Sequence, residues 1–379
     1  MIRKLNRIFQ DYMRKKRLKV GKYIWDRKEK EKIIKGNNFI EDNNIKSILF
    51  LRYDGKIGDM VVNTLMFREI KKNYPNIKIG VVTKGGAKDI ISNNKNVDKI
   101  YEYNKKTSEV KKLARKIALE KYDLLIDFSE MLRVNQMMFI NMCKAKFNMG
   151  LDRKDWNLFD ISINSDKDFK WTEHITKRYS AYLEKLGLEK NKINLEYDIY
   201  INDNNKYQEF LKKIKQNNIV VLNPYGASKH KSFNIQTLKN IIDYFKDKNT
   251  AVILLYFGDK KAELISLKNE YTYIPEDIKG IQDSIKIIEK SDMVISPDTS
   301  IVHIASALKK KLICVYPPKG GKYGVDHLVW SPIGKNIKIL FCKDKESSYD
   351  EIDINTFDFE ELKKNISIFL KEGRNEDII

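Results

Sequence analysis

Short runs of apolar residues alternate along this chain with segments in which apolar residues recur at helical spacing. In the first half, a helix is predicted from about Met60 to Asn73, and a longer helix over Trp171–Leu186 is ended by Gly187. The runs that predict buried strands in this half are Ile45–Tyr53, Ile77–Thr83, Val97–Tyr103 and Tyr122–Phe128. Strands that alternate with helices predict an open parallel sheet.

The pattern starts again after a polar, irregular stretch from about Asn191 to Asn205, which predicts a linker. The strands predicted in the second half are Ile219–Asn223, Ala251–Phe257, Met293–Ser296 and Leu312–Tyr316. The helices predicted there are Ile235–Lys248, Ile281–Lys290, Ile301–Leu308 and, as a closing element, Phe357–Leu370. Two such sets in 379 residues predict two α/β domains, with ligands in the cleft at the carboxyl ends of the strands.

Residues 1–35 precede this pattern and have a character of their own. Their apolar positions recur at helical spacing with Arg and Lys between them, and the segment holds 14 Lys or Arg against 4 Asp or Glu, or +10 of the chain's net charge of +20. A basic amphipathic helix either lies on an anionic membrane surface or packs against the body of the protein, and both alternatives stay open. The apolar positions are Ile2, Leu5, Ile8, Phe9, Tyr12 and Met13.

The rest of the composition narrows the class of protein. No apolar run approaches the roughly 18 residues of a membrane-spanning helix, and no apolar core follows the first charges, so we expect neither a span nor a secretory signal. The high positive charge would suit a nucleic-acid-binding protein, but the sequence holds no motif for one. Widely separated cysteines predict reduced, buried thiols in a cytoplasmic protein. They are Cys143, Cys314 and Cys342.

The first candidate site, Arg52–Asp59, joins the end of a buried strand to the start of a helix. Gly55 and Gly58 permit backbone conformations that are closed to other residues, although the segment is not a dinucleotide-binding fingerprint. A carboxylate at the mouth of a two-domain cleft can accept a proton from an attacking hydroxyl, which makes Asp59 a candidate base. The plainer alternative is that Asp59 caps the helix and Asp54 serves the turn.

The second candidate site begins with the loop Asn223–Phe233, which follows the first strand of the second half. Small residues, Ser228 among them, lie beside Lys229 and Lys231, and such a loop can cradle a phosphate. The alternative is an ordinary basic loop.

The segment Ser296–Leu308 completes this second site. Asp298 and Thr299 end a buried strand, and the helix that starts at Ser300 offers free N–H groups and a dipole that favour an anion. His303 falls in its first turn, where the alternative is a capped helix with a satisfied polar histidine. The four histidines of the chain form no HExxH pattern, so we expect no metal site and no cofactor, and no G-x-S-x-G elbow indicates a hydrolase.

Together these segments resemble the heptosyltransferase family, glycosyltransferase family 9, whose members transfer a heptose from ADP-heptose onto the inner core of lipopolysaccharide. One hallmark is a strand that ends in Arg and leads to Gly-Asp, here Arg52–Asp59. The other is a D-[TS]-G-x-x-H-[IL]-A-[AS]-A-L segment, here Asp298–Leu308, preceded by a lysine near an aromatic residue, here Lys231. The resemblance covers roughly residues 45–370.

This resemblance implies an α/β, GT-B glycosyltransferase fold, in which two Rossmann-like domains turn their parallel sheets toward a central cleft. It implies an inverting, metal-independent transfer between a nucleotide sugar and an anionic glycolipid. Residues 1–44 lie outside the family pattern, and we expect peripheral contact of residues 1–35 with the cytoplasmic face of the inner membrane because of their basic, amphipathic character. The expected parts are a basic extension (1–44), an acceptor domain (45–190), a nucleotide-sugar domain (191–345) and a C-terminal helix that packs back on the first domain (346–379).

The family's functional residues carry over by position. Asp59 matches the general base, Lys231 a contact of the donor diphosphate, and Asp298 a contact of the donor sugar. The residues expected in the donor site are Ser228, Lys231, Asp298, Thr299, Ser300 and His303. The residues expected in the acceptor-side loop are Arg52, Gly55, Lys56 and Gly58.

Two departures from the family pattern put the donor and acceptor in question more than the enzyme class. Ser300 replaces the usual Gly, and Asp54-Gly55-Lys56 replaces a common Ser-Ser turn. The alternatives are a transferase of the same fold that uses another nucleotide sugar for capsule or another envelope polymer, a catalytically silent scaffold, and a basic nucleic-acid-binding protein.

Overall fold

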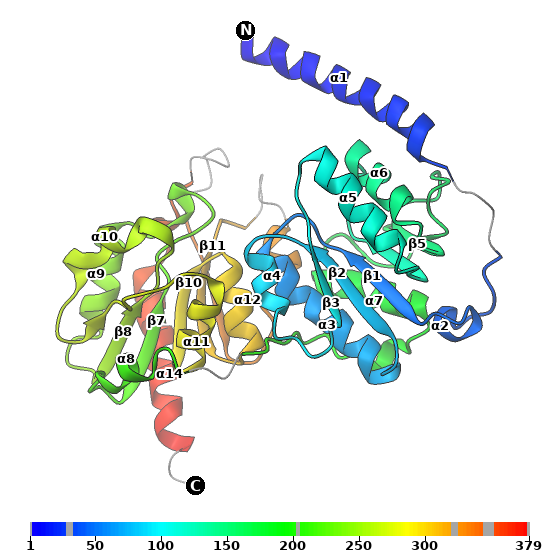
Figure 1. Ribbon diagram of the computed structural model, residues 1–379. Coiled ribbons are helices and arrows are strands. Elements are labelled where there is room, and N and C mark those ends of the chain that lie inside the picture. The colour runs from blue at the N-terminus through cyan, green and yellow to red at the C-terminus, as the bar shows by residue number, and fades with distance from the viewer. Residues whose placement is uncertain (1, 28–32, 202–204, 320–324, 344–351, 377–379) are drawn as a thin grey trace.

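The computed structural model describes residues 2–27, 33–201, 205–319, 325–343 and 352–376. They form two α/β domains, each built on a six-stranded parallel sheet (Figure 1). Every strand predicted from the sequence lies in one of these sheets, so the predicted fold class is confirmed.

The sheet of the first domain has the order β3-β2-β1-β4-β5-β6. Its central strand is fully buried at Leu49 and Phe50, which belong to separate cores on opposite faces of the sheet. The strands are β1 (Ser47–Leu51), β2 (Lys78–Thr83), β3 (Lys99–Glu102), β4 (Leu124–Asp127), β5 (Phe147–Leu151) and β6 (Ile161–Ile163). The helices are α2 (Phe39–Asp42), α3 (Ile57–Asn73), α4 (Gly86–Ile91), α5 (Thr107–Ala118), α6 (Val134–Cys143) and α7 (Ile175–Leu186).

The sheet of the second domain has the order β12-β11-β10-β7-β8-β9, which is the same winding in its own strand numbering. The strands are β7 (Asn218–Leu222), β8 (Thr250–Leu254), β9 (Thr272–Tyr273), β10 (Met293–Pro297), β11 (Lys311–Tyr316) and β12 (Ile337–Phe341). The helices are α8 (Gln208–Lys212), α9 (Ile235–Tyr244), α10 (Lys261–Leu264), α11 (Ile281–Glu289), α12 (Ser300–Ala307), α13 (Asp326–Val329) and α14 (Phe359–Glu376).

Three predicted helix starts differ from the observed ones by more than one residue, and one of them is that of α14, which begins at Phe359 rather than at Phe357. Helix α3 begins at Ile57, three residues earlier than expected, with Lys56 as its N-cap, so Asp59 lies inside the first turn. Helix α7 begins at Ile175 rather than at Trp171, because His174 is its N-cap and its ring nitrogen accepts a hydrogen bond from the Thr176 N–H. Gly187 ends α7 in the left-handed conformation, as predicted.

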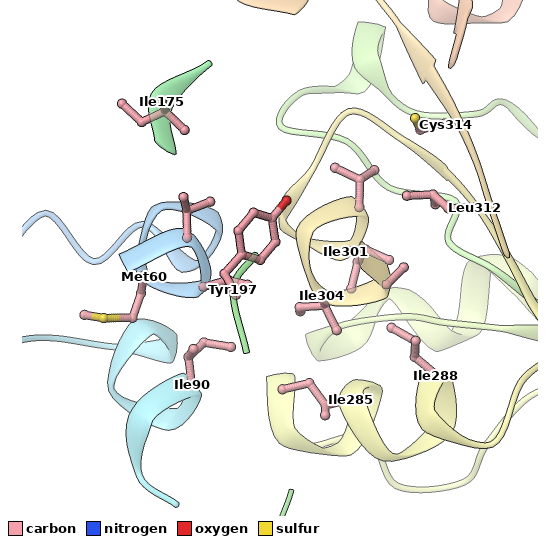
Figure 2. Close-up of a cluster of buried hydrophobic side chains, with 14 of the residues drawn as sticks. Met60, Ile90, Ile175, Tyr197, Ile285, Ile288, Ile301, Ile304, Leu312 and Cys314 are labelled. Carbon is pink, nitrogen blue, oxygen red and sulfur yellow. The ribbon is translucent and has the colours of Figure 1, made fainter. Parts of the chain in front are cut away.

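The two domains meet through a buried apolar cluster that contains Tyr197 of the linker (Figure 2). Met60 and Ile90 come from α3 and α4, and Ile301 and Ile304 come from α12. Residues 193–201 of the predicted linker are irregular, but Tyr197 is only 3% exposed, so this part of the linker is anchored in the core rather than solvated. Burial of one such side chain contributes about 1.5–3 kcal/mol, so the cluster favours a fixed domain arrangement.

Hydrogen bonds outside this cluster also join the two domains. His174 Nε2 donates to the carbonyl oxygen of Ser331 (2.7 Å), and Gln282 Nε2 donates to that of Asp89 (2.5 Å). Burial lowers the pKa of His174 and keeps the ring neutral, which suits a histidine that donates from one nitrogen and accepts at the other.

The closing helix α14 packs on the second domain, so the expectation that it returns to the first domain is wrong. Leu362 and Ile366 are fully buried in the core, the Lys311 Nζ donates to the carbonyl oxygen of Phe369 (2.7 Å), and Tyr244 of α9 hydrogen-bonds to Ser367 (2.7 Å). Figure 1 shows α14, in red, against the second sheet. The apolar stripe predicts that α14 packs but not on which sheet.

Residues before the first sheet form a 24-residue helix, α1 (Ile2–Trp25), which confirms the predicted N-terminal helix. Figure 1 shows α1 in dark blue, attached to the first domain near its C-terminal end and extended away from it. Among the helices in the described part of the chain, none is both long and apolar enough to cross a bilayer.

Candidate active site

A cavity of about 780 Å³ lies between the domains, at the carboxyl ends of both sheets. The turn that follows β1 forms its first-domain wall, and the loops that follow β7, β8 and β10 form its second-domain wall. The described lining residues on the first wall are Gly55–Asp59. Those on the second wall include Asn223, Tyr225–Ala227, Leu255–Gly258, Ile278–Ile281, Asp298–Ile301 and His303.

The first turns of α3 and α12 approach each other closely at this cavity. A Cβ placed on Gly58 would lie 3.0 Å from His303 Cδ2 and 3.6 Å from the Cα of Ser300. Gly58 is therefore required for the close approach, whereas Gly55 has φ +77° and is required for the turn itself. Two helix N-termini, one from each domain, thus lie next to the same cavity.

Asp59 is held by an arginine and is not the helix cap. Arg52 Nη2 donates to Asp59 Oδ1 at 2.6 Å, and Lys56 Nζ lies 3.9 Å from Asp59 Oδ2. Burial raises the pKa of Asp59 above its ordinary value, and the two cations oppose that rise. The capping alternative fails because Lys56 occupies the N-cap position. The carboxylate is left on the cavity wall with a fixed orientation.

Arg52 is itself fixed by aromatic neighbours. Arg52 is only 8% exposed, and its guanidinium lies 5.5 Å from the ring centre of Phe128 and donates through Nη2 to the Tyr179 hydroxyl at 2.8 Å. Asp54 Oδ2 lies 3.8 Å from Arg52 Nη1, so the predicted turn residue also takes part in this network. The role of Tyr179 could not be predicted from the sequence, because its position in the pattern is that of an ordinary buried residue on an amphipathic helix.

The donor-side acid and lysine predicted from the sequence are brought together by the fold. Lys231 Nζ lies 3.9 Å from Asp298 Oδ2, and burial raises the pKa of Asp298 while Lys231 opposes the rise. Asp298 lines the cavity, whereas Lys231, which is 7% exposed, does not belong to the described lining and supports Asp298 from behind. Ser228 is exposed and also lies outside that lining.

Helix α12 begins at Ser300, as predicted. Thr299 is its N-cap, and its hydroxyl accepts a hydrogen bond from the Ile301 N–H at 3.2 Å. Asn223, at the end of β7, donates to Ser296 Oγ (2.9 Å) and to Thr299 Oγ1 (3.3 Å), which fixes the loop before the helix. The helix therefore directs its positive end at the cavity from a rigid base.

His303 contributes a neutral ring to this wall. Burial lowers the pKa of His303 to about 3. Its Nδ1 lies 3.2 Å from the Tyr197 hydroxyl, which also accepts from the Ile333 N–H (3.3 Å). The Tyr197 hydroxyl accepts a further hydrogen bond from the Ser306 hydroxyl (3.2 Å), which leaves the phenol proton for His303 Nδ1. That arrangement places the imidazole proton on Nε2, near Gly58 and the cavity.

An aromatic pair lies in another part of the second wall. Tyr225 and Phe257 have ring centres 5.2 Å apart, and Phe257 is 59% exposed although it lines the cavity. An exposed aromatic face of this kind can stack on a planar ring such as a nucleobase. The sequence predicts Phe257 as the last residue of a strand. Strand β8 instead ends at Leu254, so Phe257 lies in the following loop, where its ring can line the cavity.

The second-domain wall of the cavity can hold an anion, and Asp59 on the first-domain wall can accept a proton. Among the residues that the structure describes, no group of three or more His, Cys, Asp or Glu side chains could hold a metal ion. Two Rossmann-like domains that share a cleft of this kind form a GT-B fold. The chain belongs to glycosyltransferase family 9 (heptosyltransferase), whose model matches residues 110–353, more than half of its length.

Curated relatives and solved structures agree with this assignment. A proposed lipopolysaccharide heptosyltransferase 4 of Escherichia coli (strain K12) is 27% identical over 345 residues, which are 89% of this chain and 92% of that protein. The lipopolysaccharide core heptosyltransferase OpsX of Haemophilus influenzae is 22% identical, over 72% of this chain and 79% of its own length.

Among solved structures, a family 9 glycosyl transferase from Veillonella parvula superposes with a TM-score of 0.73 at 16% identity, over 86% of this chain and 98% of its own. The Escherichia coli heptosyltransferase WaaC with ADP-2-deoxy-2-fluoro heptose gives 0.63 at 15% identity, over 86% and 99%. At these identities, the two solved structures support the fold of this chain. The family match includes Asp298–Leu308 and begins after Arg52–Asp59, so the role of Asp59 depends on its geometry.

Proposed function

We propose that this glycosyltransferase moves a heptose from ADP-heptose onto a sugar of a lipopolysaccharide core, with inversion at the anomeric carbon and without a metal ion. The observation that carries the proposal is the opposition of the Arg52–Asp59 pair and the N-terminus of α12 across one cavity. Family membership and the lipopolysaccharide heptosyltransferases among the relatives support the donor and the acceptor.

Asp59 acts as the general base in this proposal. The acceptor hydroxyl attacks the anomeric carbon, its proton passes to the Asp59 carboxylate, and the bond to the diphosphate breaks. Arg52 keeps the carboxylate ionised and oriented before the proton arrives. Attack from the side opposite to the leaving group inverts the configuration.

The second wall stabilises the leaving diphosphate. Its negative charge grows as the glycosidic bond breaks, and the N-terminus of α12 and the Nε2–H of the neutral His303 are already oriented toward that position. Lys231 adds a positive charge from behind Asp298. These groups supply the stabilisation that a metal ion provides in other transferases, which supports the metal-independent mechanism. The acceptor is proposed to reside at the cytoplasmic face of the inner membrane.

A donor and acceptor panel tests the proposal. Purified protein is given ADP-heptose, UDP-glucose or GDP-mannose with lipopolysaccharide core acceptors, in the presence of EDTA, and product linkage is determined by NMR. We expect transfer from ADP-heptose alone and an inverted anomeric configuration. Transfer from another nucleotide sugar to a capsule precursor would replace the proposal with the alternative of the same fold, and a retained configuration would remove Asp59 from its role.

A further inference from the structure

Helix α1 is attached to the first domain by one face near its C-terminal end. Gly21 lies so close to α6 that a Cβ there would be 2.7 Å from Val134 Cγ2, and Asn141 Nδ2 donates to the carbonyl oxygen of Trp25 (3.0 Å). Lys22 Nζ donates to the carbonyl oxygen of Asp155 at 2.8 Å, and Asp26, 4% exposed, accepts from the Leu158 N–H. The end of the helix is therefore firmly held.

A second apolar face of α1 is left uncovered. At about 100° per residue, its members fall within an arc of about 120°, on the side of the helix opposite to Leu18, Gly21 and Trp25. A row of large apolar side chains that are each about half exposed or more is unusual on a helix that already has a docked face. The exposed members are Phe9 (61%), Tyr12 (53%), Val20 (60%), Tyr23 (76%) and Ile24 (46%).

Strong positive charge accompanies this apolar face. The helix carries nine Lys or Arg and a single acidic residue, Asp11. Long basic side chains beside exposed aromatics are the chemistry that holds an interfacial helix on anionic lipids. A second copy of the chain is a poorer occupant, because two such helices would repel each other.

The free part of α1 extends toward the side on which the cavity lies. Gly21 contacts the first residue of α6, and Trp25 contacts Asn141 near its end, so the two helices run in the same direction. Helix α6 starts just after the carboxyl end of β4, at the edge of the sheet that borders the cavity. The part of α1 before Leu18 therefore extends beyond the N-terminus of α6, and Figure 1 shows the dark blue helix running away from the first domain toward its own N-terminus.

We propose that α1 is an interfacial anchor that lies on an anionic bilayer through Phe9, Tyr12, Val20, Tyr23 and Ile24, with Lys16, Arg17 and Lys19, which lie in or beside this face, on the lipid phosphates. The docked end couples this anchor rigidly to the first domain. The cavity edge is thereby held next to the surface in which a lipid-linked acceptor resides; only this last step rests on the proposed function.

The test is flotation of the full chain with vesicles of phosphatidylcholine, with or without phosphatidylglycerol. The variant Phe9→Ser/Tyr12→Ser/Val20→Ser/Tyr23→Ser changes exposed side chains only, and Leu119→Ser/Ile265→Ser, at exposed apolar positions outside α1, is the control. We expect the native chain and the control to float with anionic vesicles and to be released by salt, and the variant to lose at least about tenfold in binding.

Two results would overturn the proposal. One is unchanged flotation of the quadruple variant. The other is a dimer in light scattering that the quadruple variant converts to a monomer, which would give the apolar face to a second copy. Transfer to a soluble, delipidated acceptor should be the same in native and variant chains, while transfer to an acceptor in vesicles should fall in the variant. Flotation needs no donor, so a wrong donor assignment leaves this test intact.

Discussion

The first-domain and second-domain walls of the cavity are charged by different kinds of groups. On the first wall, a full carboxylate and a full guanidinium are paired at 2.6 Å and fixed by Tyr179 and Phe128. On the second wall, the positive potential comes from a helix N-terminus and a neutral histidine, with Lys231 behind Asp298. A titrating group suits the transfer of a proton, whereas oriented dipoles suit charge that appears and disappears. Changes in the first wall should therefore alter kcat, and changes in the second should alter nucleotide binding.

The largest effect is expected from Asp59→Asn. The amide keeps the size of the side chain but cannot accept the acceptor's proton, so kcat should fall by about 10³-fold while the Kd for ADP stays within about twofold. Rapid-quench kinetics and calorimetry measure the two quantities. The matched control is Asp54→Asn in the same turn, which should retain most of the activity. A large change in ADP affinity for Asp59→Asn would end the division of roles between the walls.

The next effect is expected from Arg52→Gln, which removes the nearer of the two cations that oppose the rise in the pKa of Asp59 on burial. The pKa of Asp59 should then rise further, and because the base must be ionised, the acidic limb of the kcat/KM profile should move to higher pH. We expect a loss of about 10–100-fold at neutral pH, with partial recovery on alkaline titration. Arg52→Lys should restore the position of the limb. A profile that does not move would show that Arg52 only supports the fold.

Gly58→Ala tests whether the two walls must touch. The new Cβ would lie 3.0 Å from His303 Cδ2, so the ring or the whole helix α12 must shift by a few tenths of an ångström. Such a shift at the reacting groups should cost about tenfold in kcat/KM. Gly280→Ala is the control, because its Cβ would meet only Asp89 Oδ2 at 3.9 Å. Equal activity of both variants would show that the domains separate during turnover.

Phe257→Ala should give a smaller effect, confined to nucleotide binding. Loss of a stacking face is worth about 1 kcal/mol, so the Kd for ADP should rise by about fivefold with little change in kcat. Ile265→Ala, exposed but outside the described lining of the cavity, is the control. If kcat falls and the affinity for ADP does not, Phe257 contacts the acceptor instead.

The sequence predicts a strand well when the apolar pattern is complete within the strand itself. Central strands such as β1 and β7 were found because burial on both faces makes them continuous apolar runs. Four strands were missed. Strand β5 is interrupted by Asn148 and Gly150, β6 and β9 have only three and two residues, and β12 is a sheet edge with Lys338 as its second residue.

The residues of the candidate active site show the same difference between local sequence patterns and long-range contacts. Asp59, Asp298, Thr299, Ser300 and His303 could be predicted because each belongs to a short segment with a recognisable order. Their partners could not, because contacts such as Arg52–Tyr179 and His303–Tyr197 join residues more than 100 positions apart. The position of Lys231 behind Asp298 likewise follows from tertiary packing and not from the loop sequence.

The smallest effect is expected from Tyr197→Phe, which removes one hydroxyl next to His303 and should reduce stability by about 1 kcal/mol. His303 has a pKa of about 3 when folded, and an ordinary value near 6.5 when unfolded, so the unfolded chain binds the extra proton between these values. The contribution of the buried His303 to the free energy of unfolding should therefore be fully present above about pH 6.5. It should fall by about 1.4 kcal/mol per pH unit as the pH decreases toward 3. Because burial is the main cause, Tyr197→Phe should keep this slope and His303→Gln should reduce it, in urea titrations at several pH values. If Tyr197→Phe removes the slope instead, the hydroxyl rather than burial keeps the second wall neutral.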